Sequence, residues 1–338
     1  MKIGSIGIDV SAEVLAAEHR IRGHVRQTPL ERSATLSRLA DGDVYLKLET
    51  AQVTGSFKLR GAMNKVLSLS KDERQRGIVT ASSGNHGTAC AYLMTHFGIP
   101  GTIYLPESVS PAKHEAIRAF GAPTELVPGD GIEAEKLARR VAAESGRTYI
   151  SPYNDPLIIG GQGTIGLELR RQIESLDAIL LPVGGGGLAA GVAGYLKSVD
   201  AEIEVIGCQP HNSRVMYESV KAGRILDLES QPTLSDGTAG GIDADSITFE
   251  PCRTLIDDWV LLREEEIGAA VLHAAEHEHV LAEGSGALSI AAFRRDPERF
   301  AGQTVVLLVS GSKLGLDTLR NLLTRPPDGE PVAKDGGA

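Results

Sequence analysis

Apolar positions along the chain gather in short runs, and amphipathic stretches of helix length separate one run from the next. Short apolar runs bounded by Gly, Pro or polar residues predict buried strands, whereas a period near 3.6 residues predicts helices. The stretch 111–120 is such a helix, because Ser110 can cap it and Pro111 occupies its first turn. The predicted strands are 44–48, 77–81, 102–105, 124–127, 148–150, 178–183, 205–208, 259–262 and 304–309. This alternation predicts an α/β fold of parallel, doubly wound open sheets.

The pattern also predicts two domains. The stretch 67–150 contains complete βα repeats of its own, so we predict a small mobile domain there, inserted into a large domain formed by 1–66 and 151–325. Helical patterns cover much of the segment before the first of these strands, with a second helix opening at Ser33. The tail 326–338 is rich in Pro, Gly and Asp and is predicted to be disordered.

Composition narrows the class of function. The chain has 338 residues, 42% of them hydrophobic, and a net charge of -10 without a run of basic residues, which argues against a nucleic-acid or anionic-membrane surface. Its three cysteines, Cys90, Cys208 and Cys252, show no metal-site spacing and are expected to be reduced core thiols. With neither a leader pattern nor a long apolar run, we expect a cytoplasmic protein that acts on a small molecule.

Glycine-rich or hydroxyl-rich loops follow three of the predicted strands. They are 82–87, 184–187 and 310–312, and each lies where ligands of doubly wound sheets bind. The first loop, Ser82-Ser83-Gly84-Asn85-His86-Gly87, suits a carboxylate or another anion, although an ordinary capped turn explains it equally well. The second loop consists of four consecutive glycines, whose entropic cost favours a phosphate cradle.

The glycine run also permits a dinucleotide interpretation, since Gly185, Gly187 and Ala190 have the spacing of that motif. A dinucleotide site needs a carboxylate at the end of the next strand to bind the ribose hydroxyls. That strand ends at Cys208-Gln209-Pro210, so the loop is better suited to a single phosphomonoester.

Lys58 lies between a strand and a helix, in the predicted first helical turn. The positive end of the helix dipole there favours the uncharged amine, which is a nucleophile. Taken alone, Lys58 is better explained as a solvated surface residue, because lysine is rarely buried.

Together these motifs resemble the fold type II family of pyridoxal-phosphate enzymes, and within it the threonine/serine dehydratase and serine racemase branch. The resemblance covers nearly the whole chain and implies a tryptophan-synthase-β-like fold with pyridoxal 5'-phosphate as cofactor. The motifs are Glu49-Thr50, Gly55-Ser56-Phe57-Lys58-Leu59-Arg60-Gly61-Ala62, Ser82-Ser83-Gly84-Asn85-His86-Gly87, Gly161-Gln162-Gly163-Thr164, Val183-Gly184-Gly185-Gly186-Gly187 and Ser310-Gly311.

The resemblance implies roles for individual residues. Lys58 would hold the cofactor as a Schiff base, with Phe57 near the pyridine ring and Asn85 at the ring hydroxyl. Ser310 would bond the ring nitrogen without forcing it to stay protonated, which favours elimination over transamination. The residues implied to bind the phosphate are Gly184, Gly185, Gly186, Gly187 and Leu188. Those implied to bind the substrate α-carboxylate are Ser82, Ser83, Asn85 and His86. The His86 ring could instead be purely structural, because the family role can rest on the backbone amide of this residue.

The resemblance implies a dehydratase that converts a 3-hydroxy amino acid to a 2-oxo acid and ammonia. The freed Lys58 amine would remove the α-proton before the β-hydroxyl leaves. Ser83 keeps a second hypothesis open, because in the racemase branch a serine here is the acid or base on the face opposite the lysine. The alternative is therefore an amino-acid racemase that uses Lys58 and Ser83. The family also implies a homodimer, and the missing regulatory domain favours a catabolic role.

Some positions depart from the family pattern. The racemase branch has a glutamate and an aspartate as cation ligands where this chain has Gln209 and Val215, so we predict no metal at that site. Lys313 is expected to be a solvent-facing cap rather than a charge near the substrate. The loop Asp236-Gly237-Thr238-Ala239-Gly240-Gly241 has glycine where serine racemases often offer a substrate hydroxyl, and no arginine occupies the expected position near Ala134. These changes favour a substrate other than serine, with a larger or more polar β-substituent.

Overall fold

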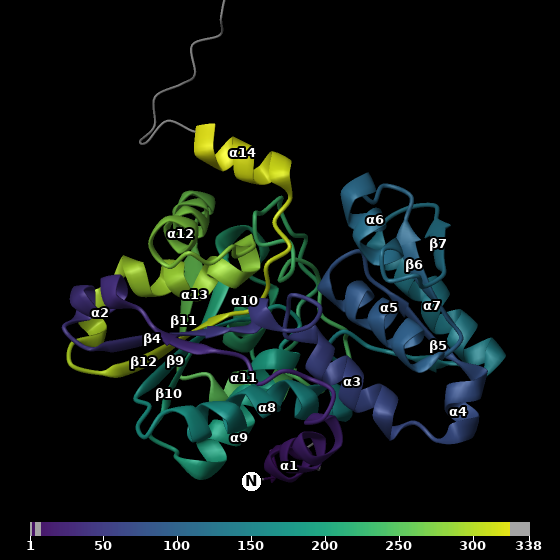
Figure 1. The fold of residues 1–338 in the computed structure, drawn as a ribbon, viewed down its shortest axis with the longest axis horizontal. Helices are drawn as coiled ribbons and strands as arrows, with labels where there is room; N and C mark the ends of the chain where they lie inside the picture. Colours follow the sequence, from purple (N-terminus) through teal and green to yellow (C-terminus); the bar gives the residue numbers. More distant parts are fainter. Residues whose placement is uncertain (1, 4–7, 325–338) are drawn as a thin grey trace, which may run out of the picture.

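A computed structural model describes residues 2–3 and 8–324; the tail predicted to be disordered lies outside these residues. The larger sheet has six strands (Figure 1). In spatial order they are β11 (Asp258–Leu262), β10 (Glu204–Pro210), β9 (Ala178–Pro182), β12 (Thr304–Val309), β4 (Asp43–Leu48) and β3 (Leu30–Arg32). All neighbours pair in parallel except β3, which is antiparallel to β4.

A second sheet of four parallel strands carries the middle of the chain. Its order is β7 (Thr124–Val127), β6 (Gly101–Pro106), β5 (Ile78–Ala81) and β8 (Thr148–Tyr149). The N-terminal strands β1 (Lys2–Ile3) and β2 (Ile8–Asp9) form a separate antiparallel pair. The α/β class with two mainly parallel sheets is therefore confirmed, whereas the proposed boundaries and mobility of the small domain stay a prediction.

Helices cover both faces of the larger sheet (Figure 1), with α1, α8, α9 and α11 on one side and α2, α12 and α13 on the other. The helices are α1 (Val10–Ile21), α2 (Ala34–Ala40), α3 (Lys58–Ser68), α4 (Lys71–Arg76), α5 (Asn85–Phe97), α6 (Pro111–Arg118), α7 (Gly131–Ser145), α8 (Pro156–Gln172), α9 (Gly187–Val199), α10 (Val215–Ala222), α11 (Phe249–Leu255), α12 (Glu264–His277), α13 (Gly284–Arg295) and α14 (Leu316–Thr324). Short 3-10 helices are η2 (Glu49–Ala51), η3 (His211–Ser213) and η4 (Pro297–Phe300).

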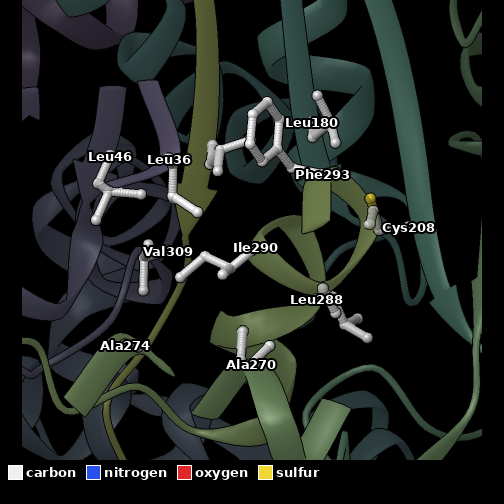
Figure 2. Close-up of a cluster of buried hydrophobic side chains, with 14 of the residues drawn as sticks. Leu36, Leu46, Leu180, Cys208, Ala270, Ala274, Leu288, Ile290, Phe293 and Val309 are labelled. Carbon is white, nitrogen blue, oxygen red and sulfur yellow. The ribbon is translucent and has the colours of Figure 1, made fainter. Parts of the chain in front are cut away.

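One of the hydrophobic cores fills the space between the larger sheet and helices α2, α12 and α13 (Figure 2). Leu46, Leu180 and Val309 come from three of its strands, and Ile290 and Phe293 from α13; all five are buried. The expected core cysteines are also confirmed, since Cys90, Cys208 and Cys252 are free and buried. In the described part of the chain, no helix is long and apolar enough to cross a membrane.

Helix α8 packs so closely against α3 and α9 that their backbones touch, which explains the glycines of the 161–164 motif. A Cβ added to Gly161 would lie 2.5 Å from Cα of Gly61 in α3, and one added to Gly163 would lie 2.7 Å from the carbonyl oxygen of Gly191 in α9. Any side chain at these positions would push the helices apart. The close packing therefore fixes α3, and with it the helix start that carries Lys58.

Candidate active site

Lys58 is the first residue of α3, and the loop before it is bound to the end of β12. Ser56 bridges to Gly311, and the Phe57 amide donates to the Ser310 carbonyl at 3.1 Å. The Lys58 Nζ donates to the carbonyl of Pro152 at 2.9 Å. Its side chain keeps some exposed surface, yet loss of hydration lowers the pKa of Lys58 to about 8. The lowered pKa expected from the helix start is therefore found, but burial is its largest cause.

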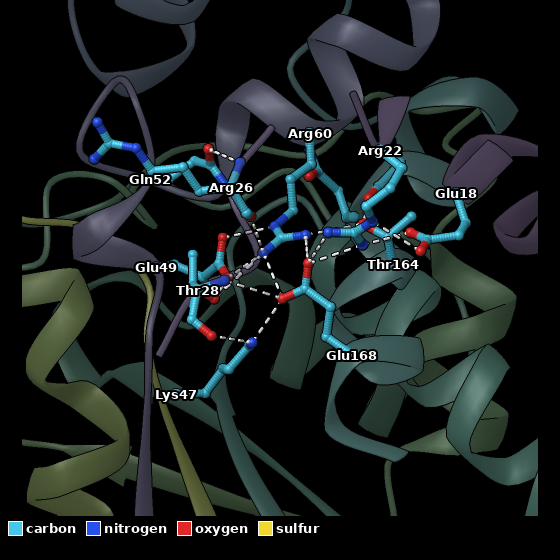
Figure 3. Close-up of polar contacts among 12 residues, drawn as sticks. Glu18, Arg22, Arg26, Thr28, Lys47, Glu49, Gln52, Arg60, Thr164 and Glu168 are labelled. Atoms are coloured by element: carbon cyan, nitrogen blue, oxygen red, sulfur yellow. Dashed lines mark hydrogen bonds and ion pairs between the residues drawn. The ribbon is translucent and has the colours of Figure 1, made fainter. Parts of the chain in front are cut away.

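Behind Lys58, a buried network of charges holds α3 in place (Figure 3). Arg60 forms ion pairs with Glu49 at 2.8 Å and with Glu168 at 2.7 Å, and Lys47 pairs with Glu168 at 2.7 Å. These four side chains are fully buried. Burial alone would raise the pKa of Glu168, but Arg60 and Lys47 outweigh it and lower that pKa to about 2. The network ties α3 to α8 and β4, and the sequence pattern did not single out Lys47 or Glu168.

The loop after β5 leads directly into α5. Ser82 and Ser83 are half-buried on this turn, and the Gly84 amide donates to the Ser82 hydroxyl at 3.3 Å. Asn85 begins the helix and donates from Nδ2 to Oε1 of Glu283 at 2.7 Å. The turn thus exposes hydroxyl groups and backbone N–H groups at a helix start, which is the environment that an anion requires.

The His86 ring faces the end of the small sheet rather than open space. His86 is buried, and its Nε2 bonds the carbonyl of Ile150 at 2.9 Å. Burial, reinforced by the charge of Lys58, lowers the pKa of His86 to about 3, so the ring is neutral. A contribution of His86 to carboxylate binding would therefore come from its backbone N–H, and its ring acts as a structural link.

The four-glycine loop between β9 and α9 forms a cradle without room for side chains. A Cβ on Gly185 would lie 2.5 Å from the Tyr153 ring, and one on Gly186 would lie 2.7 Å from Sγ of Cys252. Gly186 also has a φ of +84°, which favours glycine. Gly187 begins α9, and Leu188 is buried behind it. Backbone N–H groups at this helix start are the donors that a phosphate binds.

Glu283, which the sequence pattern did not single out, lies under the Ser310 loop. Its Oε2 accepts the Lys313 backbone N–H at 2.9 Å, and burial, with Asp236 nearby, raises its pKa to about 7. The expected solvent-facing role of Lys313 is wrong, because its half-buried ammonium donates to the Thr88 hydroxyl in α5. The sequence offered only a weak signal for Glu283: it precedes the small residues that open α13, and its side chain makes no capping hydrogen bond there.

The family follows from comparison with known proteins. Residues 21–311 match the family model described as pyridoxal-phosphate dependent enzyme. The chain belongs to this family. It is 38% identical over 313 residues to the L-threonine ammonia-lyase of Thermotoga maritima, covering 93% of this chain and 78% of that protein.

Solved structures of this pyridoxal-phosphate family have the same fold. Maize serine racemase superposes with a TM-score of 0.86 at 30% identity, covering 93% of this chain and 96% of the racemase. The processed form of threonine deaminase isoform 2 from Solanum lycopersicum also gives a TM-score of 0.86, at 33% identity, covering 93% and 91% of the two chains. The expected fold type II class is therefore confirmed, and the cofactor of this enzyme is pyridoxal 5'-phosphate.

The residues around Lys58 fit this cofactor. Three buried polar atoms have no hydrogen-bond partner. Oγ1 of Thr54 and Oγ of Ser56 belong to the segment just before Lys58, and Oδ1 of Asn85 belongs to the start of α5. A buried polar atom without a partner is costly, so a bound group with polar substituents is expected there. The glycine cradle supplies the matching site for a phosphate.

Gln209 lies at the position where the sequence resemblance implied a cation ligand. Gln209 is buried, donates from Nε2 to the Val183 carbonyl at 2.9 Å and accepts the Tyr217 N–H at 2.8 Å. Within residues 2–3 and 8–324, no cluster of three or more His, Cys, Asp or Glu side chains could hold a metal ion. The absence of a cation from this site stays a prediction.

Proposed function

We propose that this enzyme is a hydroxy-amino-acid dehydratase, an ammonia-lyase that converts a threonine- or serine-like 3-hydroxy amino acid to a 2-oxo acid and ammonia. The observation that carries the proposal is the amine of Lys58, whose pKa is lowered to about 8 by burial and whose Nζ is oriented by the Pro152 carbonyl. An amine of this kind accepts a proton readily near neutral pH.

The cofactor, when bound, supplies the electron sink that makes the α-proton of an amino acid acidic. Lys58 removes this proton at Nζ, and the β-hydroxyl then leaves as water after it gains a proton from the cofactor phosphate or a nearby acid. Ser82, Ser83, Asn85 and the backbone N–H of His86 bind the α-carboxylate. The enamine that is released reacts with water to give the 2-oxo acid and ammonia.

The remaining residues orient the cofactor. We assign the phosphate to Gly184, Gly185, Gly186, Gly187 and Leu188. Phe57 would lie beside the pyridine ring of the cofactor. Its side chain lies next to the Lys58 amine, with Nζ 5.1 Å from the centroid of the Phe57 ring. Asn85 would bond the ring hydroxyl of the cofactor, and Ser310 would bond its ring nitrogen.

A specific observation favours a second activity. Ser83 is half-buried within the proposed carboxylate loop, and a serine there can exchange a proton on the face opposite Lys58. Amino-acid racemisation is therefore the alternative, and the similarity to maize serine racemase supports it.

We further propose a cytoplasmic homodimer in which residues 67–150 act as the small mobile domain over the large domain formed by 1–66 and 151–325.

We also propose that the substrate has a larger or more polar β-substituent than serine. The loop 236–241 supports this, because it has glycine where the family pattern has a substrate-binding hydroxyl.

A substrate panel tests the proposed reaction. Purified holoenzyme is incubated with the stereoisomers of serine, threonine and bulkier 3-hydroxy amino acids, and ammonia, 2-oxo acid and the enantiomer ratio are measured. We expect stoichiometric ammonia and 2-oxo acid from at least one 3-hydroxy amino acid other than serine. Enantiomer exchange without ammonia would favour the racemase, and equal turnover of serine and every bulkier substrate would remove the basis for the substrate proposal.

A further inference from the structure

Glu283 is a buried carboxyl group that the proposed reaction does not use. Only 4% of its surface is exposed, and each of its oxygens faces a donor. Oε1 accepts from Nδ2 of Asn85 at 2.7 Å, and Oε2 accepts from the Lys313 backbone N–H at 2.9 Å. Because the backbone N–H cannot turn around, Oε2 must always be an acceptor, and a proton on Glu283 must be on Oε1.

The Asn85 amide must respond to that proton. An ionised carboxylate accepts but cannot donate, so the Asn85 NH₂ faces Glu283, and its carbonyl Oδ1 is left without a partner in the protein. A protonated Glu283 would instead donate to Oδ1, and the amide would turn by half a rotation. The NH₂ group would then be the free end of Asn85.

We propose that Glu283 is a positioning residue whose protonation state decides which end of the Asn85 amide faces the cofactor. This inference rests on the proposed place of Asn85 beside the ring hydroxyl. Ionised Glu283 presents a carbonyl oxygen, which stabilises the neutral ring hydroxyl. Protonated Glu283 presents an NH₂ group, which stabilises the ring oxygen as an anion and so favours the proton on the imine nitrogen.

The charges around Glu283 determine the pH range in which its carboxyl group changes protonation state. Burial and Asp236 on the facing loop outweigh the groups that lower the pKa of Glu283 and raise it to about 7. The ammonium of Lys313, which lies against α5, lowers it, and Lys58 also interacts with Glu283 across the site. Asp236 is itself paired with Lys113 from α6 at 2.6 Å. Elements from both sheets therefore contribute to the protonation of one carboxyl group.

The absorption spectrum of the holoenzyme without substrate tests the inference. The imine with an anionic ring oxygen absorbs in the visible, and the form with a neutral ring hydroxyl absorbs in the near ultraviolet. We expect the visible band of the wild type to weaken as the pH rises through about 7, with a matching gain in the near ultraviolet. In Glu283→Gln, the Lys313 N–H holds the new carbonyl oxygen, so the new NH₂ faces Asn85 and fixes the low-pH arrangement. The visible band of this variant should not change over the same pH range.

Two further variants keep the test decisive if Glu283→Gln folds poorly. Lys313→Met removes the cation that favours ionised Glu283 and should move the spectral midpoint to higher pH, whereas Lys136→Met, at an exposed pair on α7, should leave it unchanged. A wild-type transition that persists in Glu283→Gln, or a midpoint unaffected by Lys313→Met, would overturn the inference. It would indicate that Asn85 serves the ring through its second N–H.

Asn85→Ala separates this inference from the proposed site. If Asn85→Ala alters the spectrum but Glu283→Gln leaves the pH transition intact, Asn85 keeps its place at the ring and only the role of Glu283 fails. If Asn85→Ala retains the wild-type spectrum and transition, the proposed place of Asn85 itself is wrong, and the inference falls with it.

Discussion

Replacing Glu168 by glutamine removes a charge from the centre of the buried network that holds α3. In the folded protein Glu168 pairs with Arg60 and Lys47, and the Arg22 guanidinium also lies 3.0 Å from its Oε1. The variant leaves these three cations with one fewer buried partner. We therefore expect Glu168→Gln to destabilise the protein, and the start of α3 at Lys58 with it.

The size of the effect follows from the pKa of Glu168. The pKa of about 2 lies below the ordinary glutamate value of 4.5, so the charge stabilises the folded state above pH 4.5. This contribution is lost as the pH falls towards 2. The gap between the two values corresponds to about 3 kcal/mol of unfolding free energy at neutral pH. The stability difference between wild type and variant should shrink by about 2 kcal/mol between pH 6 and pH 3.

Urea denaturation followed by circular dichroism at several pH values measures this difference. Glu174→Gln is the matched control, because Glu174 is exposed just beyond the same helix and should change stability by less than about 0.5 kcal/mol. A Glu168→Gln variant as stable as the control at pH 7, or a stability difference that grows as the pH falls, would show that the Glu168 charge does not stabilise the folded protein.

Three further predictions concern the ligands. Gly185→Ala places a Cβ against the Tyr153 ring and should weaken cofactor binding by about tenfold or more in a fluorescence titration. Gly23→Ala, whose Cβ meets no neighbour, is the control and should leave the affinity unchanged. Equal affinities of the two variants would contradict phosphate binding by the glycine loop. Chelation should leave ammonia release unchanged because Gln209 offers an amide instead of a carboxylate, and a loss restored by magnesium would show a cation site. Ser83→Ala should abolish any enantiomer exchange and spare elimination; persisting exchange would require another base.

Strand positions and the loops at their carboxyl ends could be predicted because they depend on local patterns. Each predicted strand has a counterpart in the two sheets, and Lys58 does begin a helix. The edge strand β3 was missed, since Leu30-Glu31-Arg32 contains a single apolar residue and is held by pairing with β4. Such a strand is defined by its neighbour in space rather than by its own sequence.

The polar interior could not be predicted for the same physical reason. Glu168 acquires its role from partners that are distant in sequence, because Lys47 lies in β4 and Arg60 in α3. Lys313 was expected in solvent on the average behaviour of lysine, but the fold places it against Thr88. Burial and pairing of charged groups depend on tertiary structure, so a single sequence shows such residues without showing their partners.

Chemical trapping shows directly whether Lys58 holds the cofactor. The holoenzyme is reduced with borohydride and digested, and the modified lysine is identified by mass spectrometry. We predict a cofactor adduct on Lys58, and in Lys58→Ala the loss of both the adduct and ammonia release. An active, cofactor-bearing protein in which Lys58 stays unmodified, or in which another lysine carries the adduct, would contradict the account.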